Sequence, residues 1–189
     1  LAIVVALQVG DYPSTTMVVV KDNLCVEYKA VPGLARNIEV LARVGLVVSI
    51  AGSCVYAHDA SGRLVWSVEP GGIPVDVAVC ERGVLVAVRR ETRSGLPGLF
   101  TRDFVVLYDG QGARVWTREV PPGVSRVRAW GDDVLIAGAG GVTAVSDSGT
   151  TRWNLKTPAP VKAMEISADG SAMYVLTEAG EVGCYRLKR

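Results

Sequence analysis

The chain has 189 residues, of which 49% are hydrophobic, 21% charged and 6% aromatic, and its formal net charge is +1. This length and apolar fraction suffice for one well-buried domain and exclude a disordered chain. The balanced charge gives no general attraction to nucleic acid or to a membrane surface, so we expect neither as the main partner.

The N-terminal 33 residues contain the first predicted strands. The apolar segment 1–7 is far shorter than the ~20 residues that a membrane-spanning helix needs, and it lacks the features of a complete signal peptide. It belongs instead to a strand over 3–9, which is followed by strands over 17–22 and 24–28. We therefore predict an incomplete unit that lacks its first strand, in a chain that begins inside a strand.

Three complete units of four strands follow. Their strands are short runs rich in Val and Leu, separated by Gly, Asp or Pro, and no segment has a helical period. The predicted strands are 38–44, 47–50, 55–58 and 64–68 in the first unit, 75–80, 84–88, 104–108 and 115–120 in the second, and 124–130, 134–137, 142–145 and 151–155 in the third.

A last, incomplete unit has strands over 161–167, 173–177 and 182–187, with no fourth strand. Pro and Gly cluster after the last strand of each earlier unit, and Pro cannot donate to a sheet ladder. We expect these clusters to be the crossings between units, and they lie at 31–33, 70–74, 121–123 and 158–160.

A tryptophan signature repeats near the end of each complete unit. It is Asp59–Trp66, then Asp109–Trp116, and then a shorter copy ending at Trp153, in which either Ser146 or Asp147 takes the place of the first Asp. Each Trp follows a glycine by four residues, and glycine adopts the positive φ of tight turns at little cost. We expect the tryptophans to pack between neighbouring units. Trp130 packs in the same way or lines a central pocket.

Four-stranded units of about 40 residues are typical of β-propeller blades. The signature resembles the quinoprotein-like (PQQ-type) repeat, and WD40-like propellers are a neighbouring group, although Gly-His…Trp-Asp pairs are absent. The resemblance implies an all-β propeller of four-stranded antiparallel blades, whose strands run in order from the axis outward.

We expect one propeller domain over 1–189 with about four to five blades. The predicted blades are approximately 1–33 (partial), 37–70, 74–121, 124–158 and 160–189 (partial). Either the chain closes as a ring of about five blades, or a longer parent chain or a second copy in a homodimer completes a larger ring. We favour the larger ring because Leu1 begins inside a strand.

The segment 89–102 is an insertion between the second and third strands of its unit, and it explains why Trp66 and Trp116 are 50 residues apart whereas Trp116 and Trp153 are 37 apart. The resemblance implies that this loop shares a face with the crossings between blades, where most propellers bind their partners. Its arginines and apolar residues favour protein contacts, although a solvated loop without a role is the alternative. The predicted partner-binding residues are Arg89, Arg90, Arg93, Leu96, Leu99, Phe100 and Arg102.

The remaining polar residues predict no catalytic or metal site. His58 and Asp59 have no nucleophile placed beside them, and Asp132, Asp133 and Asp169 are typical turn residues. The cysteines at 25, 54, 80 and 184 form no C-x-x-C pair and lie in apolar strands, which favours buried free thiols over a zinc site and leaves one disulfide as an alternative. We expect no cofactor, and the cellular compartment stays undecided.

We therefore predict a non-catalytic protein–protein interaction scaffold that presents loops on one propeller face to a partner of unknown identity. The alternative is a small-molecule-binding or enzymatic propeller of the quinoprotein-like group. The lack of convergent His, Glu or Asp residues favours the scaffold. A quinone-dependent dehydrogenase would need adjacent cysteines and an acidic cluster, which the sequence lacks.

Overall fold

A computed structural model describes residues 3–8, 14–21, 24–32, 35–41, 46–59, 63–90, 103–146 and 148–188; before residue 46 the description covers the backbone. All regular elements in these ranges are β-strands, and they form five antiparallel sheets. Within the described residues, no helix is long and apolar enough to cross a membrane.

The sheets follow one another along the chain, and each is built from consecutive strands. Sheet 1 contains β1 (Ile3–Gln8), β2 (Ser14–Lys21) and β3 (Leu24–Pro32). Sheet 2 contains β4 (Ala35–Leu41), β5 (Leu46–Ala51), β6 (Cys54–Asp59) and β7 (Leu64–Val68). Sheet 3 contains β8 (Ile73–Cys80), β9 (Gly83–Arg89), β10 (Asp103–Tyr108) and β11 (Arg114–Val120). Sheet 4 contains β12 (Arg126–Trp130), β13 (Asp133–Gly138), β14 (Gly141–Ser146) and β15 (Thr151–Leu155), and sheet 5 contains β16 (Val161–Ile166), β17 (Ala172–Thr177) and β18 (Val182–Arg186).

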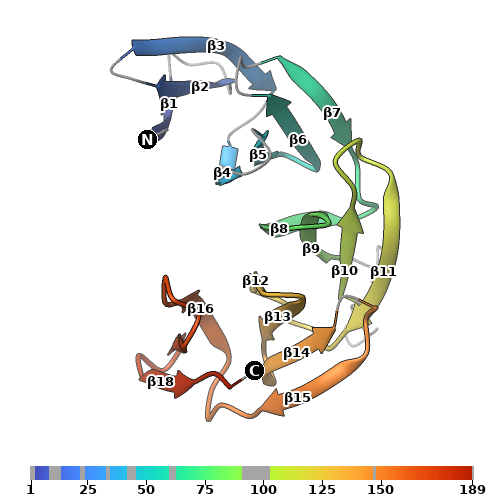
Figure 1. Cartoon of the computed structure of the whole chain (residues 1–189), viewed down its shortest axis with the longest axis vertical. Coiled ribbons are helices and arrows are strands. Elements are labelled where there is room, and N and C mark those ends of the chain that lie inside the picture. The colour runs from blue at the N-terminus through green and yellow to red at the C-terminus, as the bar shows by residue number, and fades with distance from the viewer. Residues whose placement is uncertain are drawn as a thin grey trace, which may run out of the picture.

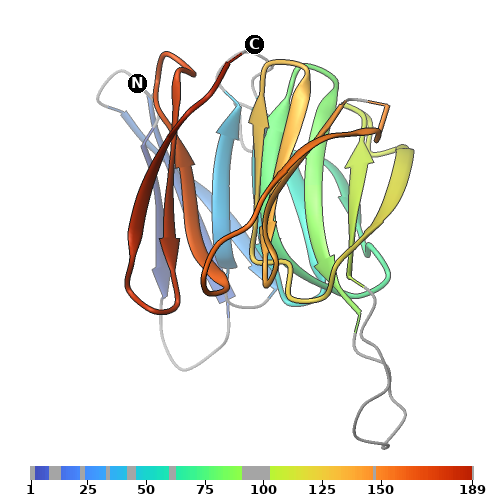
Figure 2. The same ribbon diagram turned by 90° about the horizontal axis from the view of Figure 1, so that it is seen from below.

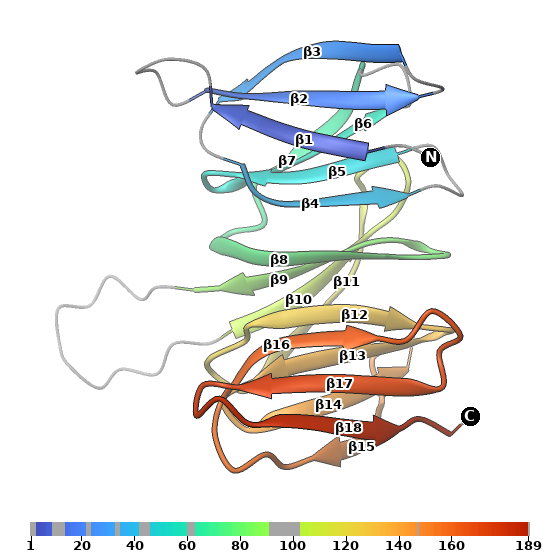
Figure 3. The same cartoon turned by 90° about the vertical axis from the view of Figure 1, so that its left-hand side faces the viewer.

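The five sheets are arranged as the sectors of an open arc (Figure 1). The first strands β4, β8, β12 and β16 lie toward the centre, and β7, β11 and β15 lie at the rim. Figure 2 shows that the strands run between two faces of this arc, where the turns lie. The predicted all-β propeller class is confirmed, and the arc is open between sheets 1 and 5 (Figure 3). The predicted blade boundaries and the single domain stay predictions.

The same type of turn connects the third and fourth strands of each complete sheet. The Asp59 carboxylate accepts a hydrogen bond from the Arg63 amide at 3.0 Å, and the Asp109 carboxylate accepts one from the Ala113 amide at 2.8 Å. In sheet 4 the Ser146 hydroxyl oxygen accepts the corresponding bond from the Thr150 amide at 3.0 Å. A short polar side chain that satisfies a nearby amide stabilises such a turn. Ser146 therefore holds the Asp place in the third copy of the signature.

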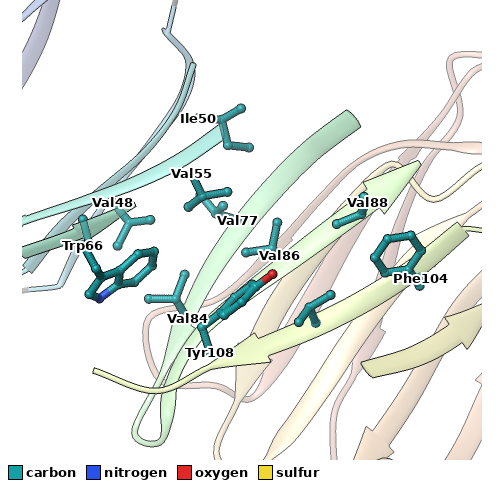
Figure 4. Packing of buried hydrophobic residues seen from close by; sticks show 12 residues of the cluster. Val48, Ile50, Val55, Trp66, Val77, Val84, Val86, Val88, Phe104 and Tyr108 are labelled. Atoms are coloured by element: carbon teal, nitrogen blue, oxygen red, sulfur yellow. The ribbon is translucent and has the colours of Figure 1, made fainter. Parts of the chain in front are cut away.

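Apolar side chains fill the spaces between sheets 2 and 3, between sheets 3 and 4, and between sheets 4 and 5. Figure 4 shows the cluster between sheets 2 and 3, where Trp66 lies near Tyr108 with ring centroids 6.2 Å apart. The Trp66 indole N–H donates to the Gly110 carbonyl at 3.1 Å, and its ring packs against Gly112, where a Cβ would lie 2.8 Å from Trp66 Cγ. The turn of sheet 3 is thereby shaped to receive the tryptophan of sheet 2.

The other tryptophans also pack between sheets. Trp116 is partly buried in the cluster between sheets 3 and 4, and Trp153 is partly buried in the cluster between sheets 4 and 5. Trp130 is 6% exposed in this last cluster and donates from its indole nitrogen to the Gly170 carbonyl at 2.8 Å. The prediction that the tryptophans pack between units is confirmed, and Trp130 shares this role.

The described cysteines are free thiols. Cys54 and Cys80 are half-buried and Cys184 is exposed, whereas the side chain of Cys25 lies outside the described residues. The prediction of burial is therefore wrong for Cys184. It lies on β18, where the described chain supplies neither a fourth strand nor a following sheet to cover it.

Candidate functional site

The predicted partner-binding loop begins where β9 ends, at Arg89, and it ends where β10 begins, at Asp103. Arg89 and Arg90 are exposed at its start. The other predicted contact residues, Arg93, Leu96, Leu99, Phe100 and Arg102, lie outside the described residues. Of the predicted contact residues, the structure therefore describes only Arg89 and Arg90, which form the base of the insertion.

Both arginines at the base have contacts within the chain. Arg89 donates from Nη2 to the Val124 carbonyl at 3.2 Å, which links β9 to the crossing between sheets 3 and 4. The guanidinium carbon of Arg90 lies 5.5 Å from the centroid of the Phe104 ring, a cation–π distance. These contacts orient the two side chains, and Arg still has donors to offer because its guanidinium carries five N–H groups.

Asp103 anchors the other end of the insertion. Its side chain is fully buried, and Oδ2 accepts hydrogen bonds from the backbone amides of Gly123 and Val124 at 2.7 and 2.8 Å. Oδ1 is buried without a hydrogen-bond partner in the structure. A buried carboxylate is expensive unless donors surround it, so the two amides fix the crossing firmly against β10. Sequence reasoning missed this residue because its donors lie about 20 positions away.

A cleft of about 390 Å³ lies beside this anchor, between β11 and strands β13 to β15. Its wall includes Val120, Val124 and Ile136, and the turn 138–141 forms one end. Arg118 and Lys156 also line the cleft.

Local contacts fix the shape of the cleft. The Arg118 guanidinium donates to the Thr151 hydroxyl oxygen at 2.7 Å, and the Thr143 hydroxyl donates to Asn154 Oδ1 at 2.8 Å. Gly141 has φ +114° and its backbone abuts the Leu155 carbonyl, so a side chain does not fit there. The sequence signal for this site is the glycine-rich run 138–141, which separates the predicted strands 134–137 and 142–145.

Charged residues of the inner strands form a second arrangement, away from the cleft. Asp76 of β8 accepts hydrogen bonds at Oδ2 from the Val127 amide at 2.8 Å and from Arg128 Nη1 at 2.9 Å. Arg128 of β12 also pairs with Glu165 of β16 through Nη2 at 2.6 Å and Nε at 3.2 Å. Burial raises the pKa of Asp76, while the Val127 amide and Arg128 oppose that shift. These ion pairs form a chain of charges that joins sheets 3, 4 and 5, and we assign it a structural role.

The single histidine, His58, lies on β6 next to Asp59. Burial lowers the pKa of His58, which favours the neutral ring, and the charge of Asp59 opposes this shift. The Asp59 carboxylate binds the Arg63 amide and guanidinium, the latter at 3.1 Å. Asp59 therefore stabilises the turn between β6 and β7.

Two of the other acidic residues that we predicted as turn residues also form local hydrogen bonds. Asp133 accepts from Arg152 at 3.3 Å, and Asp169 accepts from Ser167 and Ser171, whose hydrogen bonds lower the pKa of Asp169 to about 2. In the described ranges, no group of three or more His, Cys, Asp or Glu side chains is placed to hold a metal ion.

Comparisons with known proteins show the kind of fold. No protein-family model and no curated protein matches the chain. Solved structures do match. BBS1N, solved in complex with ARL6DN, superposes with a TM-score of 0.73 at 14% identity, over 93% of this chain and 61% of that one. The fold is that of a WD40-like β-propeller.

Two further propellers agree. The Pan2 WD40 domain of Neurospora crassa has a TM-score of 0.66 at 11% identity, over 89% of this chain and 55% of that one. Hsv2 of Kluyveromyces marxianus has a TM-score of 0.63 at 12% identity, over 95% and 58%. The chain thus spans less than two thirds of the length of each of these propellers, and a PQQ-type repeat is not shown by them.

Proposed function

We propose that the chain is a non-catalytic scaffold that binds a protein partner at the base of the insertion and along the adjacent cleft. The observation that carries this proposal is the anchoring of both ends of the insertion on one crossing, through Arg89 to the Val124 carbonyl and through Asp103 to the Gly123 and Val124 amides. Because both ends of the loop are held in place, the loop loses less conformational entropy when it binds a partner.

The chemistry of this surface favours an acidic partner segment. Arg89, Arg90, Arg118 and Lys156 lie around it, and among the described residues that line the cleft Glu119 is the single acidic one. Arginine contributes strongly to protein interfaces because it forms paired hydrogen bonds with carboxylates. BBS1N was solved in complex with another protein, ARL6DN, which supports a protein partner for this chain as well. The predicted contacts at Arg93, Leu96, Leu99, Phe100 and Arg102 remain part of the proposal.

The test begins with affinity capture under nuclease treatment, followed by measurement of the dissociation constant with the purified partner. The variant Arg89→Ala/Arg90→Ala/Arg118→Ala should bind at least about tenfold more weakly, since the loss of a single hot-spot arginine costs about 2 kcal/mol or more and a tenfold change is about 1.4 kcal/mol. Arg63→Ala/Arg152→Ala is the matched control, because these arginines pair with Asp59 and Asp133 at turns on the other face. Equal affinity of both variants would contradict the proposal.

A second candidate function is small-molecule binding by a propeller of the quinoprotein-like type. The cleft favours it, since about 390 Å³ lies within the range of ligand pockets. A bound ligand would appear as an absorbance band or an excess native mass in protein purified from its source. Gly140 lines the cleft, and a Cβ at this position meets no atom within 4 Å, so Gly140→Trp should fill the cleft without a clash. Loss of the excess mass in this variant would assign the ligand to the cleft.

The open arc also supports our proposal that further sheets complete a larger ring, from a longer parent chain or from a second copy. The matched propellers are longer than this chain, and closed propellers have about four to eight blades. Native mass measurement of the 189-residue chain separates the two sources, because a second copy doubles the mass of 20.0 kDa. A compact monomer whose scattering profile is that of a closed ring would contradict the proposal that further sheets complete the ring, from either source.

A further inference from the structure

The cleft between sheets 3 and 4 has a filled counterpart between sheets 2 and 3. In sheet 3, Phe104 of β10 pairs with Val88 of β9, and both side chains are buried in the apolar cluster against sheet 2 (Figure 4). The equivalent pair in sheet 4 is Gly141 of β14 and Gly138 of β13, and both glycines line the cleft. The cleft therefore lies where the repeat places a phenylalanine and a valine one sheet earlier.

The register of the two sheets makes these positions equivalent. Phe104 lies five residues before Asp109, and Gly141 lies five residues before Ser146, which closes the corresponding turn. Because protein interiors are closely packed, a place that one sheet fills with an aromatic ring and the next sheet leaves to a glycine suits a ring from another molecule.

The wall of the cleft also differs from its filled counterpart. Val68 of β7 packs in the cluster between sheets 2 and 3, and Arg118 has the equivalent position on β11. The buried Val106 of β10 is matched by Thr143 on β14. Arg118 and Thr143 both line the cleft, so apolar residues of one interface are matched by polar residues of the next.

Neither the completed ring nor the insertion is a suitable cover for this cleft. Sheet 3 lies between sheets 2 and 4, and sheet 4 lies between sheets 3 and 5, so added sheets would join the arc elsewhere (Figure 1). The insertion 89–102 has one aromatic residue, Phe100, and it carries four arginines against the single acidic residue Glu91. Its charge has the same sign as Arg118 and Lys156, and like charges in contact disfavour binding.

We propose that the cleft binds a partner protein through one aromatic side chain, Phe or Tyr, that is flanked by acidic residues. The ring packs against Val124 and Ile136, at the place equivalent to the Phe104 ring, and the acidic side chains face Arg118 and Lys156. This inference rests on the proposed scaffold function and names the chemistry of the partner segment.

The ring and the charges contribute to binding in different ways. Burial of an aromatic ring supplies most of the apolar area, and a cleft of about 390 Å³ is within the range of pockets that hold such groups. Arginine contacts both rings and carboxylates, and Arg90 lies 5.5 Å from the Phe104 ring centroid in the filled counterpart. Arg118 donates one hydrogen bond to Thr151, which leaves further N–H groups for a carboxylate of the partner.

The first experiment selects ligands from a phage-displayed library of random heptapeptides on the 189-residue chain. We expect enriched peptides to carry Phe or Tyr within two residues of Asp or Glu. They should bind Gly140→Trp at least about tenfold more weakly, because the indole fills the cleft and excludes the aromatic anchor.

Gly110→Trp is the matched control for the filled cleft. A Cβ at Gly110 also meets no atom within 4 Å, and this glycine lies in the turn between β10 and β11, outside the lining of the cleft. The enriched peptides should bind this variant as they bind the unsubstituted chain. Equal binding to the two tryptophan variants, enrichment of peptides without an aromatic residue, or no enrichment would overturn the proposal.

A double-mutant cycle tests the position of the acidic residue. Fluorescence anisotropy measures the affinity of a fluorescein-labelled enriched peptide and of its Asn/Gln analogue for the chain and for Arg118→Val, which introduces the residue type of Val68. Each single change should weaken binding about threefold or more, and both together should weaken it little further, because the two groups act as a pair. Additive losses would contradict the pairing of the acidic residue with Arg118.

The remaining outcomes separate this inference from the proposed function. If a captured partner is lost from Arg89→Ala/Arg90→Ala/Arg118→Ala but binds Gly140→Trp normally, the scaffold surface stands and the aromatic site is wrong. Three results would replace the partner segment by another occupant and overturn the proposal. Affinity for free N-acetylphenylalanine equal to that for the peptide would indicate a small aromatic acid. A dimer in sedimentation that Gly140→Trp dissociates would indicate a second copy, and tighter peptide binding by Phe100→Ala would indicate the insertion.

Discussion

Sheets 4 and 5 share one register but differ in what covers them. Leu135 pairs with Ala144, and Tyr174 pairs with Cys184 at the equivalent place. The first pair is fully buried because sheet 5 packs over it and β15 extends the sheet beside it, whereas the second pair is exposed. In this fold, therefore, burial depends on the next strand and the next sheet more than on the type of residue.

The largest expected effect comes from placing the same charge in both sheets. Ala144→Arg buries an unpaired charge in a filled core and should lower the free energy of unfolding by about 4 kcal/mol or more. Cys184→Arg should change it by less than about 0.5 kcal/mol, because the side chain extends into solvent. Urea denaturation measures both, and similar losses would show that sheet 5 is covered in solution.

We expect a smaller difference in the free energy of unfolding when alanine replaces two glycines that occupy similar turns. Gly112 and Gly180 have φ values of +82° and +84°, but a Cβ at Gly112 meets the Trp66 ring whereas one at Gly180 meets nothing within 4 Å. Gly180→Ala should cost about 1 kcal/mol from backbone strain alone. Gly112→Ala should cost about 1–3 kcal/mol more because Trp66 must move. Equal thermal shifts for the two variants would mean that Trp66 does not seat on this turn.

The smallest effect concerns the pH dependence of the first turn in sheet 5. The folded pKa of Asp169 is lowered to about 2 by its serine hydrogen bonds, below the ordinary value of 3.8. Its contribution is therefore present above about pH 4 and is lost as the pH falls toward 2. Asp169→Asn should slightly lower the unfolding midpoint at pH 7 and match the unsubstituted chain near pH 2. A constant difference across this range would argue against the carboxylate as the cause.

The strands were predictable because each is a short Val-rich run between turn residues, and the packing of Trp66 followed from its repeated spacing. Cys184 was predicted to be buried because its strand has the same apolar pattern as the others. The sequence of β18 does not reveal whether a neighbouring strand is present. Asp103 and the cleft depend on contacts between segments that are distant in sequence, which local patterns do not encode. Arg89 and Arg90 were identified as surface residues, but their contacts with Val124 and Phe104 were not.

The chain of charges through Asp76, Arg128 and Glu165 has a mechanical consequence. It joins β8, β12 and β16, which lie toward the centre of the arc (Figure 1), whereas Trp66, Trp116 and Trp153 pack between sheets from the outer strands β7, β11 and β15. The ion pairs therefore hold sheets 3, 4 and 5 together at their inner strands, in addition to the apolar packing between these sheets. A ligand that competes for Arg128, or a rise in ionic strength that weakens its exposed bond to Glu165, should therefore loosen the contact between sheets 4 and 5 while each sheet keeps its own hydrogen bonds.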